Sequence, residues 1–199
     1  MKEKEQFQNA FLHLVDYGYP AVVKKMIKYV DVKTKSAGLF LAVDKGDTKI
    51  VKILLKSGVD INVKEDFYGN TALMKAVNNG DKKNVKLLLE SGADVNIKNK
   101  YTQDALFRAS VDGKASIVKM LLEAGADINS TDYKNWTSLM VASNNGSINI
   151  VKLLIKNGAD VNIRNIEGFN AYDLAVAKKR RRIEQLLKES GVETENNKN

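Results

Sequence analysis

The side chains that could carry out catalysis are few in this chain of 199 residues. It contains no cysteine and one histidine, His13. A cysteine–histidine dyad and a metal site with several histidine ligands are therefore impossible, and a serine triad would need His13 as its base. His13 falls in an N-terminal helical segment, where a surface or packing role is the favoured interpretation. We therefore expect no catalytic residue, no metal site and no cofactor, and interpret the chain as non-enzymatic.

Four aspartates recur along the chain and could suggest paired carboxylates or a metal site. They are Asp60, Asp94, Asp127 and Asp160. They occur one per repeated segment, and helices that pack about 10 Å apart would place them at or beyond the separation of roughly 5 to 9.5 Å used in glycoside hydrolysis. The favoured interpretation is that each carboxylate accepts a hydrogen bond from the backbone in a turn.

These aspartates belong to a phrase that the chain repeats. Residues 85–96 read VKLLLESGADVN, and similar phrases begin at Val51, Val118 and Val151. The glycines at positions 58, 92, 125, 158 and 191 recur every 33 or 34 residues. A fixed period of this size is typical of a solenoid, in which each repeat is one supersecondary unit packed on its neighbours. Such an array offers an elongated surface rather than a closed pocket, which favours a function in recognition.

Each repeat is expected to contain two helices. Residues 71–79 have apolar residues at helical spacing, with Thr71 as an N-cap or first-turn residue, and Gly80 ends this helix. Asp81 is placed to cap the second helix, which is apolar on most of its circumference from Val85 to Leu89 and so needs neighbours on both sides. The order helix, turn, helix and extended hairpin resembles the ankyrin repeat. The family's Gly-Ala-Asp-Val-Asn phrase is nearly intact at 92–96, 125–129 and 158–162, and its Thr-Pro-Leu-His phrase is degraded at 71–74, 104–107 and 137–140.

The resemblance implies an all-α fold, a solenoid of stacked helix-turn-helix units with projecting β-hairpin-like loops. Met74, Phe107 and Met140 stand where the family phrase has histidine. We therefore expect cohesion between repeats to depend on apolar packing more than in consensus members. Asp104 and Asn170 replace the threonine and can still cap a helix.

The chain is predicted to form a single domain over residues 1–191, with about six units. These are an N-terminal cap (5–31), four repeats (32–65, 66–98, 99–131 and 132–164) and a C-terminal cap (165–191). In the last unit Glu184 and Lys188 replace apolar residues, as a terminal repeat without a further neighbour requires. The polar segment 192–199 is expected to be disordered.

Aromatic and large apolar side chains lie in the turn-rich segments between repeats. Tyr and Trp are favoured interface anchors, and Trp136 and Phe169 share one position a repeat apart. The ankyrin resemblance implies a protein-interaction scaffold that binds through its concave face and hairpin tips. The expected partner-binding residues are Phe67, Tyr68, Asn78, Lys98, Tyr101, Val111, Tyr133, Trp136, Asn144, Arg164, Ile166 and Phe169.

Two alternatives remain for parts of this surface. Phe67 and Ile166 could instead pack between adjacent hairpins, and Asn79 and Asn145 could cap the ends of helices. Because basic residues lie among the aromatics, we expect a partner protein that carries acidic groups around an apolar patch. We also expect the chain to be a monomer.

The net charge of +8 also requires an interpretation. Lys52, Lys86, Lys119 and Lys152 share one position of the repeat, which favours a solvated face over a nucleic-acid footprint. The run Lys178, Lys179, Arg180, Arg181 and Arg182 falls where the last unit turns between its helices. A solvated cap is favoured there, and the alternative function is binding of a polyanion, either nucleic acid or anionic lipid.

The sequence also bears on location. No stretch approaches the roughly 18 apolar residues of a membrane span, and we expect no signal peptide. A cytoplasmic location is therefore expected, while a nuclear location and delivery into a host cell as an effector stay open.

Overall fold

The computed structural model describes residues 2–192 and divides the chain into two compact units, Met1–Asn99 and Lys100–Asn199. We describe each unit separately. The single domain over 1–191, with its cap and repeat boundaries, remains a prediction. The prediction of disorder over residues 192–199 is wrong for Val192, because this residue is 4% exposed and its N–H donates to the Leu187 carbonyl at 3.3 Å. Residues 193–199 lie outside the described residues.

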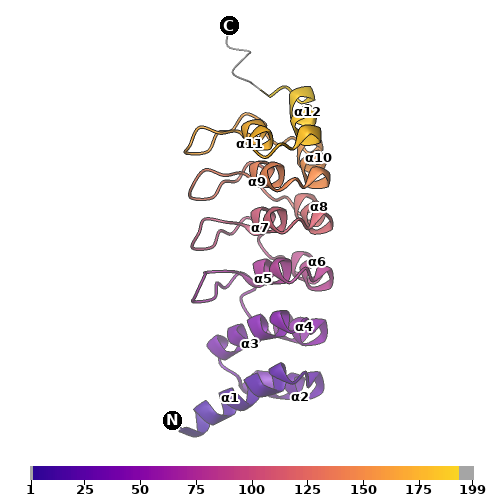
Figure 1. The fold of residues 1–199 in the computed structure, drawn as a ribbon. Coiled ribbons are helices and arrows are strands. Elements are labelled where there is room, and N and C mark those ends of the chain that lie inside the picture. The colour runs from indigo at the N-terminus through magenta and orange to yellow at the C-terminus, as the bar shows by residue number, and fades with distance from the viewer. Residues whose placement is uncertain (1, 193–199) are drawn as a thin grey trace. The chain divides into compact units, whose positions relative to one another are not determined.

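The first unit consists of three helix pairs. They are α1 (Lys2–Asp16) with α2 (Pro20–Met26), α3 (Val32–Asp44) with α4 (Thr48–Lys56), and α5 (Ala72–Asn78) with α6 (Lys82–Glu90). A short 3₁₀ helix, η1 (Ile27–Tyr29), follows α2. Helix α3 packs on both α1 and α5, while α4 packs on both α2 and α6. The segment between α4 and α5 projects beyond α5 on the side away from α6 (Figure 1).

The second unit repeats the arrangement. Its pairs are α7 (Ala105–Val111) with α8 (Ala115–Glu123), α9 (Ser138–Asn145) with α10 (Ile148–Lys156), and α11 (Ala171–Ala177) with α12 (Arg181–Glu189). Helix α9 packs on α7 and α11, and α10 packs on α8 and α12. The segments before α9 and α11 project away from α10 and α12 (Figure 1).

The predicted all-α repeat fold is confirmed. Between residues 2 and 192 there is no β-strand, and the hairpin segments contribute only the isolated bridges Lys64–Thr71 and Thr131–Thr137.

The helices begin where capping side chains predict. Thr71, Asp104 and Thr137 each accept a hydrogen bond from the backbone N–H three residues later, and Asn170 forms a capping box with Asp173. These bonds satisfy N–H groups that a helix leaves without an internal partner. The predicted cap of α6 is also present, since Asp81 accepts from the N–H groups of residues 83 and 84.

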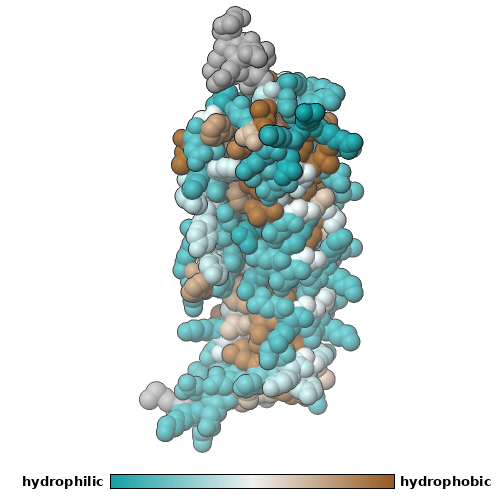
Figure 2. Space-filling model, in the orientation of Figure 1, coloured by the Kyte–Doolittle hydropathy of each residue, from teal (hydrophilic) through white to brown (hydrophobic). Residues whose placement is uncertain are grey.

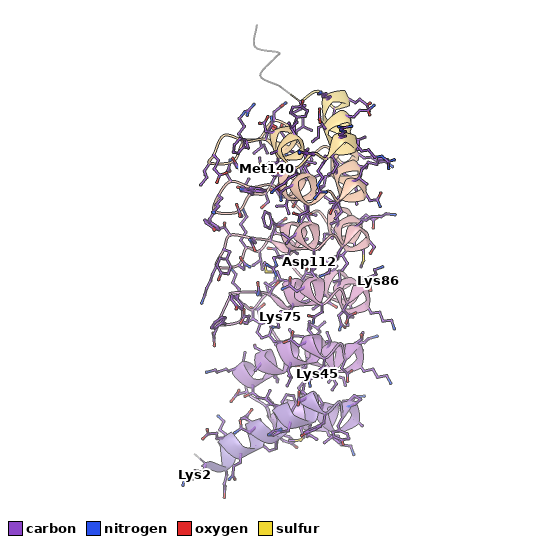
Figure 3. The ribbon with its side chains drawn as sticks, viewed as in Figure 1. Lys2, Lys45, Lys75, Lys86, Asp112 and Met140 are labelled. Atoms are coloured by element: carbon purple, nitrogen blue, oxygen red, sulfur yellow. The ribbon has the colours of Figure 1, made fainter. Side chains whose placement is uncertain are left out.

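The core of each unit is apolar, as expected from the apolar residues that stand where the family phrase has histidine. Met74 in the first unit is 1% exposed, and Phe107 and Met140 in the second are 5% and 1% exposed. Burial of such side chains stabilises by about 1.5–3 kcal/mol each. On the second helices, Val85 and Leu88 are fully buried, whereas Lys86 extends outward into solvent (Figure 3).

The last helix pair has the polar outer surface expected of an end. Glu184 and Lys188 form an ion pair of 3.1 Å on α12. The Lys188 ammonium also lies 5.4 Å from the centre of the Tyr172 ring. Hydrogen bonding to Glu184 and to Tyr172 raises the pKa of Lys188.

Candidate interaction surface

The recurring aspartates organise the hairpins. The carboxylates of Asp60, Asp94, Asp127 and Asp160 each accept a hydrogen bond from the backbone N–H two residues later, at 2.8 to 3.0 Å. In the first unit the Asn62 side chain accepts from the Asp94 N–H at 2.9 Å, and in the second Asn129 accepts from Asp160 at 2.9 Å. The turn interpretation is therefore confirmed, and the side chains of Asn62 and Asn129 join neighbouring hairpins within each unit.

The hairpin of the first unit is built around Glu65. Its carboxylate accepts hydrogen bonds from the backbone N–H groups of Phe67, Tyr68 and Asn70, at 3.1, 2.8 and 3.4 Å. Partial burial raises the pKa of Glu65, but these three bonds outweigh that effect and hold it below its usual value of 4.5. The rings of Phe67 and Tyr68 meet edge to face, with centroids 4.4 Å apart.

A hollow of about 700 Å³ lies between this hairpin and α3. Its apolar lining comes from Val32, Ala37 and Phe40 on α3 and from Val63 and Phe67 on the hairpin. Val32 is 70% exposed and Phe67 is 72% exposed, so apolar surface is available at the mouth. We call this site the α3 groove.

Sequence reasoning found Phe67 but missed Val32 and Phe40. The sequence signal that could have revealed these two residues is Asp31, whose carboxylate caps α3 by accepting a hydrogen bond from the Thr34 N–H at 2.9 Å. That bond is the largest of the causes that lower the pKa of Asp31. Because of this cap, α3 begins earlier in its repeat than α5 does in the next. The difference is seen in their lengths, which are 13 residues for α3 and 7 residues for α5.

In the second unit two consecutive hairpins present aromatic residues in equivalent positions. The Asp132 carboxylate accepts from the N–H groups of Lys134 and Trp136, at 2.9 and 3.0 Å. The Asn165 side chain accepts from the N–H groups of Glu167 and Phe169 in the same way, at 3.0 and 2.9 Å. Trp136 and Phe169 therefore occupy matching places, with Trp136 half-buried and Phe169 45% exposed.

The hairpin tips expose further apolar side chains. Tyr133 is 62% exposed and Ile166 is 67% exposed. The alternative in which Phe67 and Ile166 pack between hairpins is wrong, because both side chains face solvent. Only the backbone of Ile166 joins its neighbour, through a 3.1 Å hydrogen bond from its N–H to the Lys134 carbonyl. Tyr101 (48%) and Val111 (38%) are also exposed.

Other predicted contact residues make bonds within the protein. Arg164 donates to the Gly168 carbonyl at 2.7 Å and pairs with Asp173 at 3.1 Å. The Lys98 carbonyl accepts from the Lys64 ammonium at 2.7 Å. Asn78 is half-buried, and the Asn144 amide donates to the Asn145 side chain at 3.1 Å. These residues hold the hairpins and helix ends in place as well as bordering the surface.

Asn79 and Asn145 have a role that the sequence did not reveal. Each side-chain amide donates to a carbonyl near the end of the preceding first helix, Asn79 to Val43 at 3.3 Å and Asn145 to Val111 at 3.2 Å. Lys45 occupies the equivalent position and pairs with Asp16 at 2.8 Å, which raises the pKa of Lys45. This position of the repeat therefore links adjacent helix pairs.

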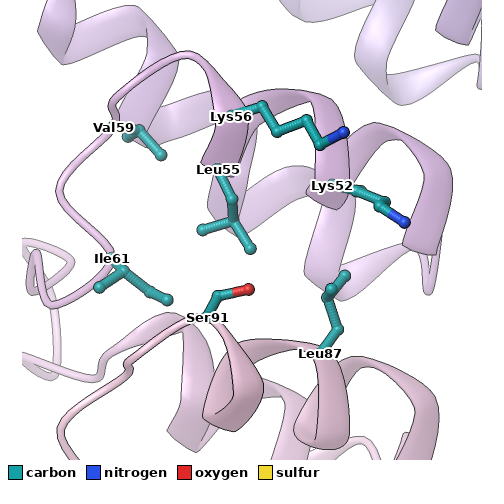
Figure 4. A pocket seen from close by; sticks show the side chains of 7 residues that line it. All are labelled: Lys52, Leu55, Lys56, Val59, Ile61, Leu87 and Ser91. Atoms are coloured by element: carbon teal, nitrogen blue, oxygen red, sulfur yellow. The ribbon is translucent and has the colours of Figure 1, made fainter.

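The second helices form a different kind of surface. A hollow of about 280 Å³ between α4 and α6 has an apolar floor of Leu55, Val59, Ile61 and Leu87, with Lys52, Lys56 and Ser91 around it (Figure 4). Its lining contains no carboxylate and no imidazole, so it offers no acid–base pair for catalysis. Elsewhere the visible surface is largely hydrophilic, with hydrophobic patches between hydrophilic side chains (Figure 2).

The basic run lies where the sequence placed it, beginning in the turn between α11 and α12 and extending into the first residues of α12. All five residues, Lys178, Lys179, Arg180, Arg181 and Arg182, are exposed. His13 is exposed on α1 and stacks with Tyr17 at a centroid distance of 6.3 Å.

Comparison with known protein families identifies the class of protein to which the chain belongs. Three overlapping stretches, residues 10–99, 39–132 and 106–198, match the family described as Ankyrin repeats (3 copies). Together they cover nearly the whole chain, so the protein belongs to the ankyrin repeat family. Such repeats are generally protein–protein interaction modules and are typically non-catalytic. No curated protein matches the sequence significantly. Among the helices of residues 2–192, none has the length and apolar character to cross a membrane.

Proposed function

We propose that this protein is a non-catalytic scaffold that binds a partner protein through its hairpin tips and first helices. The observation that carries the proposal is the α3 groove, where Val32 and Phe67 stand at least 70% exposed on either side of an apolar hollow. When a partner covers water-exposed apolar surface in a concave site, the free energy of binding becomes more favourable by roughly 25 cal/mol per Å² of apolar surface buried.

The second unit supports the same mode of binding. Tyr133, Trp136, Ile166 and Phe169 project from hairpins whose backbones are fixed by Asp132 and Asn165, so little conformational entropy is lost when a partner binds. Lys33 and Lys64 border the α3 groove, and Lys134 lies 5.7 Å from the Tyr133 ring centre. Glu65 and Asp66 also line the α3 groove, so the cations lie at parts of its rim. Positive charge beside apolar surface suits a partner with acidic groups around an apolar patch, and it accelerates encounter.

The test is affinity capture from the source cytosol with matched variants. One variant is Val32→Ala/Phe67→Ala, and a second is Trp136→Ala/Phe169→Ala. The control is Tyr19→Ala/Val22→Ala, which removes side chains that are 54% and 40% exposed, Tyr19 just before α2 and Val22 in its first turn. The captured protein is then purified, and its affinity for each variant is measured by calorimetry.

We expect each site variant to weaken binding by about 2 kcal/mol or more, as truncation of a central interface residue does. The control should bind as the wild type does. Equal binding by all variants would refute the assignment of this face. Loss of the helical circular dichroism signal in Trp136→Ala/Phe169→Ala would instead show that these two side chains belong to the core.

A further inference from the structure

The turn between α11 and α12 carries a second feature that the proposed function does not use. Lys179, Arg180, Arg181 and Arg182 line a hollow of about 330 Å³ whose remaining walls include Ile148 and Ile183. Across residues 2–192, none of these four cations forms an ion pair with a carboxylate. The carboxylate of Glu184 is already engaged by Lys188 at 3.1 Å.

One of the cations lies close to the backbone of a neighbouring turn. An added Cβ at Gly146 would lie 2.9 Å from Nε of Arg180 and 3.0 Å from its guanidinium carbon. The guanidinium therefore lies beside Gly146 in the turn between α9 and α10, while Arg180 as a whole is exposed. Paired N–H groups of an exposed guanidinium can bind an oxyanion through two hydrogen bonds.

The cluster is present despite two costs to stability. Lys179 has φ of +55°, at a position where Gly46, Gly80, Gly113 and Gly146 provide the left-handed conformation in earlier repeats. Arg181 and Arg182 are in the first turn of α12, where positive charge opposes the helix dipole and no side chain caps the helix. In the first unit, the corresponding helices α4 and α6 are capped by Asp47 and Asp81, whereas α8 and α10 of the second unit, like α12, have no side-chain cap.

The shape of the site indicates the class of ligand. A second hollow of about 230 Å³ shares Ile148 and Arg182 with the first and continues past Leu186 to Glu189. The two hollows adjoin along α12. Their apolar lining comes from Ile148, Ile183 and Leu186, with the basic run at one end and Lys152 beside Glu189 at the other. The Glu189 carboxylate interrupts the positive charge, which disfavours a long nucleic-acid track, and an elongated groove suits an extended chain better than a lipid headgroup.

The geometry points to a binding site for an acidic peptide segment in this groove, between α10 and α12. Carboxylate or phosphate groups of the segment pair with Arg180, Arg181 and Arg182, and a neighbouring apolar side chain covers Ile148 and Ile183. The site does not depend on the proposed function, because it lies at the opposite end of α11 from the hairpins.

The experiment is a fluorescence anisotropy titration with three fluorescein-labelled peptides of equal length. One contains glutamates next to leucine, one has phosphoserines in place of the glutamates, and one has serines there. The test variant is Arg181→Gln/Arg182→Gln. The matched control is Lys82→Gln/Lys83→Gln, which removes two exposed charges at the equivalent positions of α6.

We expect the glutamate or phosphoserine peptide to bind and the serine peptide to bind at least tenfold more weakly. The Arg181→Gln/Arg182→Gln variant should lose at least tenfold in affinity, while the control stays within twofold of the wild type. Equal affinities for the two variants would overturn the proposal, as would failure of both acidic peptides to bind at millimolar concentration. Tighter binding of duplex DNA, or of phosphatidylserine vesicles, than of either peptide would assign the site to a nucleic acid or a membrane instead. The thermal melting curve of each variant shows that it is folded.

Discussion

Lys179 allows backbone strain and charge to be separated in one experiment. Its N–H donates to the Val176 carbonyl at 2.9 Å, and the Arg180 N–H donates to the Ala175 carbonyl at 2.8 Å. Gly80 makes the equivalent bond to Val77 at 2.9 Å. The helix ending is therefore the same in both repeats, and Lys179 adopts the left-handed conformation, with φ of +55°, that glycine adopts at no steric cost.

The magnitude follows from two opposing effects of Lys179→Gly. Relief of the left-handed conformation stabilises by about 1–2 kcal/mol. The greater freedom of glycine in the unfolded chain costs about 0.5–1 kcal/mol. We expect Lys179→Gly to raise the free energy of unfolding by about 0.5–1 kcal/mol, and Lys179→Ala to leave it within about 0.5 kcal/mol of the wild type, because alanine keeps the strain.

The assay is urea unfolding followed by circular dichroism, together with amide hydrogen exchange in α12. In a repeat protein the gain should be concentrated in the helix pair that carries the change. Both variants remove the same charge, so they should weaken binding of the acidic peptides equally. If Lys179→Gly is no more stable than Lys179→Ala, the strain argument is refuted, whatever happens to binding.

Two further predictions concern the hairpins and the core. The Glu65 carboxylate has a lowered folded pKa, so the unfolded chain binds more protons in mild acid, and the hairpin should loosen as pH falls through that pKa. Glu65→Gln should remove this acid sensitivity and destabilise the hairpin at neutral pH by about 1 kcal/mol, seen as faster amide exchange at Phe67 and Tyr68. Met140→Ala should cost about 2–5 kcal/mol in urea unfolding, because the side chain is 1% exposed and leaves a cavity. A cost below about 1 kcal/mol would show that the repeats do not depend on apolar packing at this position.

The features that could be predicted from the sequence are those that a single repeat encodes locally. Thr71 caps α5 through a bond to a residue three positions away, and the period of the glycines gives the helix pairs. Burial of Met74 and Met140 follows from their place on the inner side of a helix that must pack on both neighbours.

The features that could not be predicted depend on departures from the repeat or on contacts between repeats. The α3 groove exists because Asp31 starts α3 early, a change that alignment to the other repeats conceals. The bond from Asn145 to the Val111 carbonyl joins residues 34 apart in sequence, and the surrounding residues do not specify it. The exposure of Ile166 depends on the hairpin turn, since its backbone bonds to Lys134 while its side chain faces solvent.

The two proposed surfaces of the second unit are separated by one helix. Phe169 lies just before α11 begins at Ala171, and Lys179 lies just after it ends at Ala177. A helix of 7 residues rises about 10 Å, a distance at which substitutions without shared contacts act nearly independently. Variants of the hairpins therefore serve as folded controls for the basic turn, and the reverse also holds. The same separation permits one partner to contact the hairpins while an acidic segment occupies the groove between α10 and α12. If that segment belongs to the same partner, the two contacts reinforce each other through effective concentration, and the loss of either weakens the whole complex.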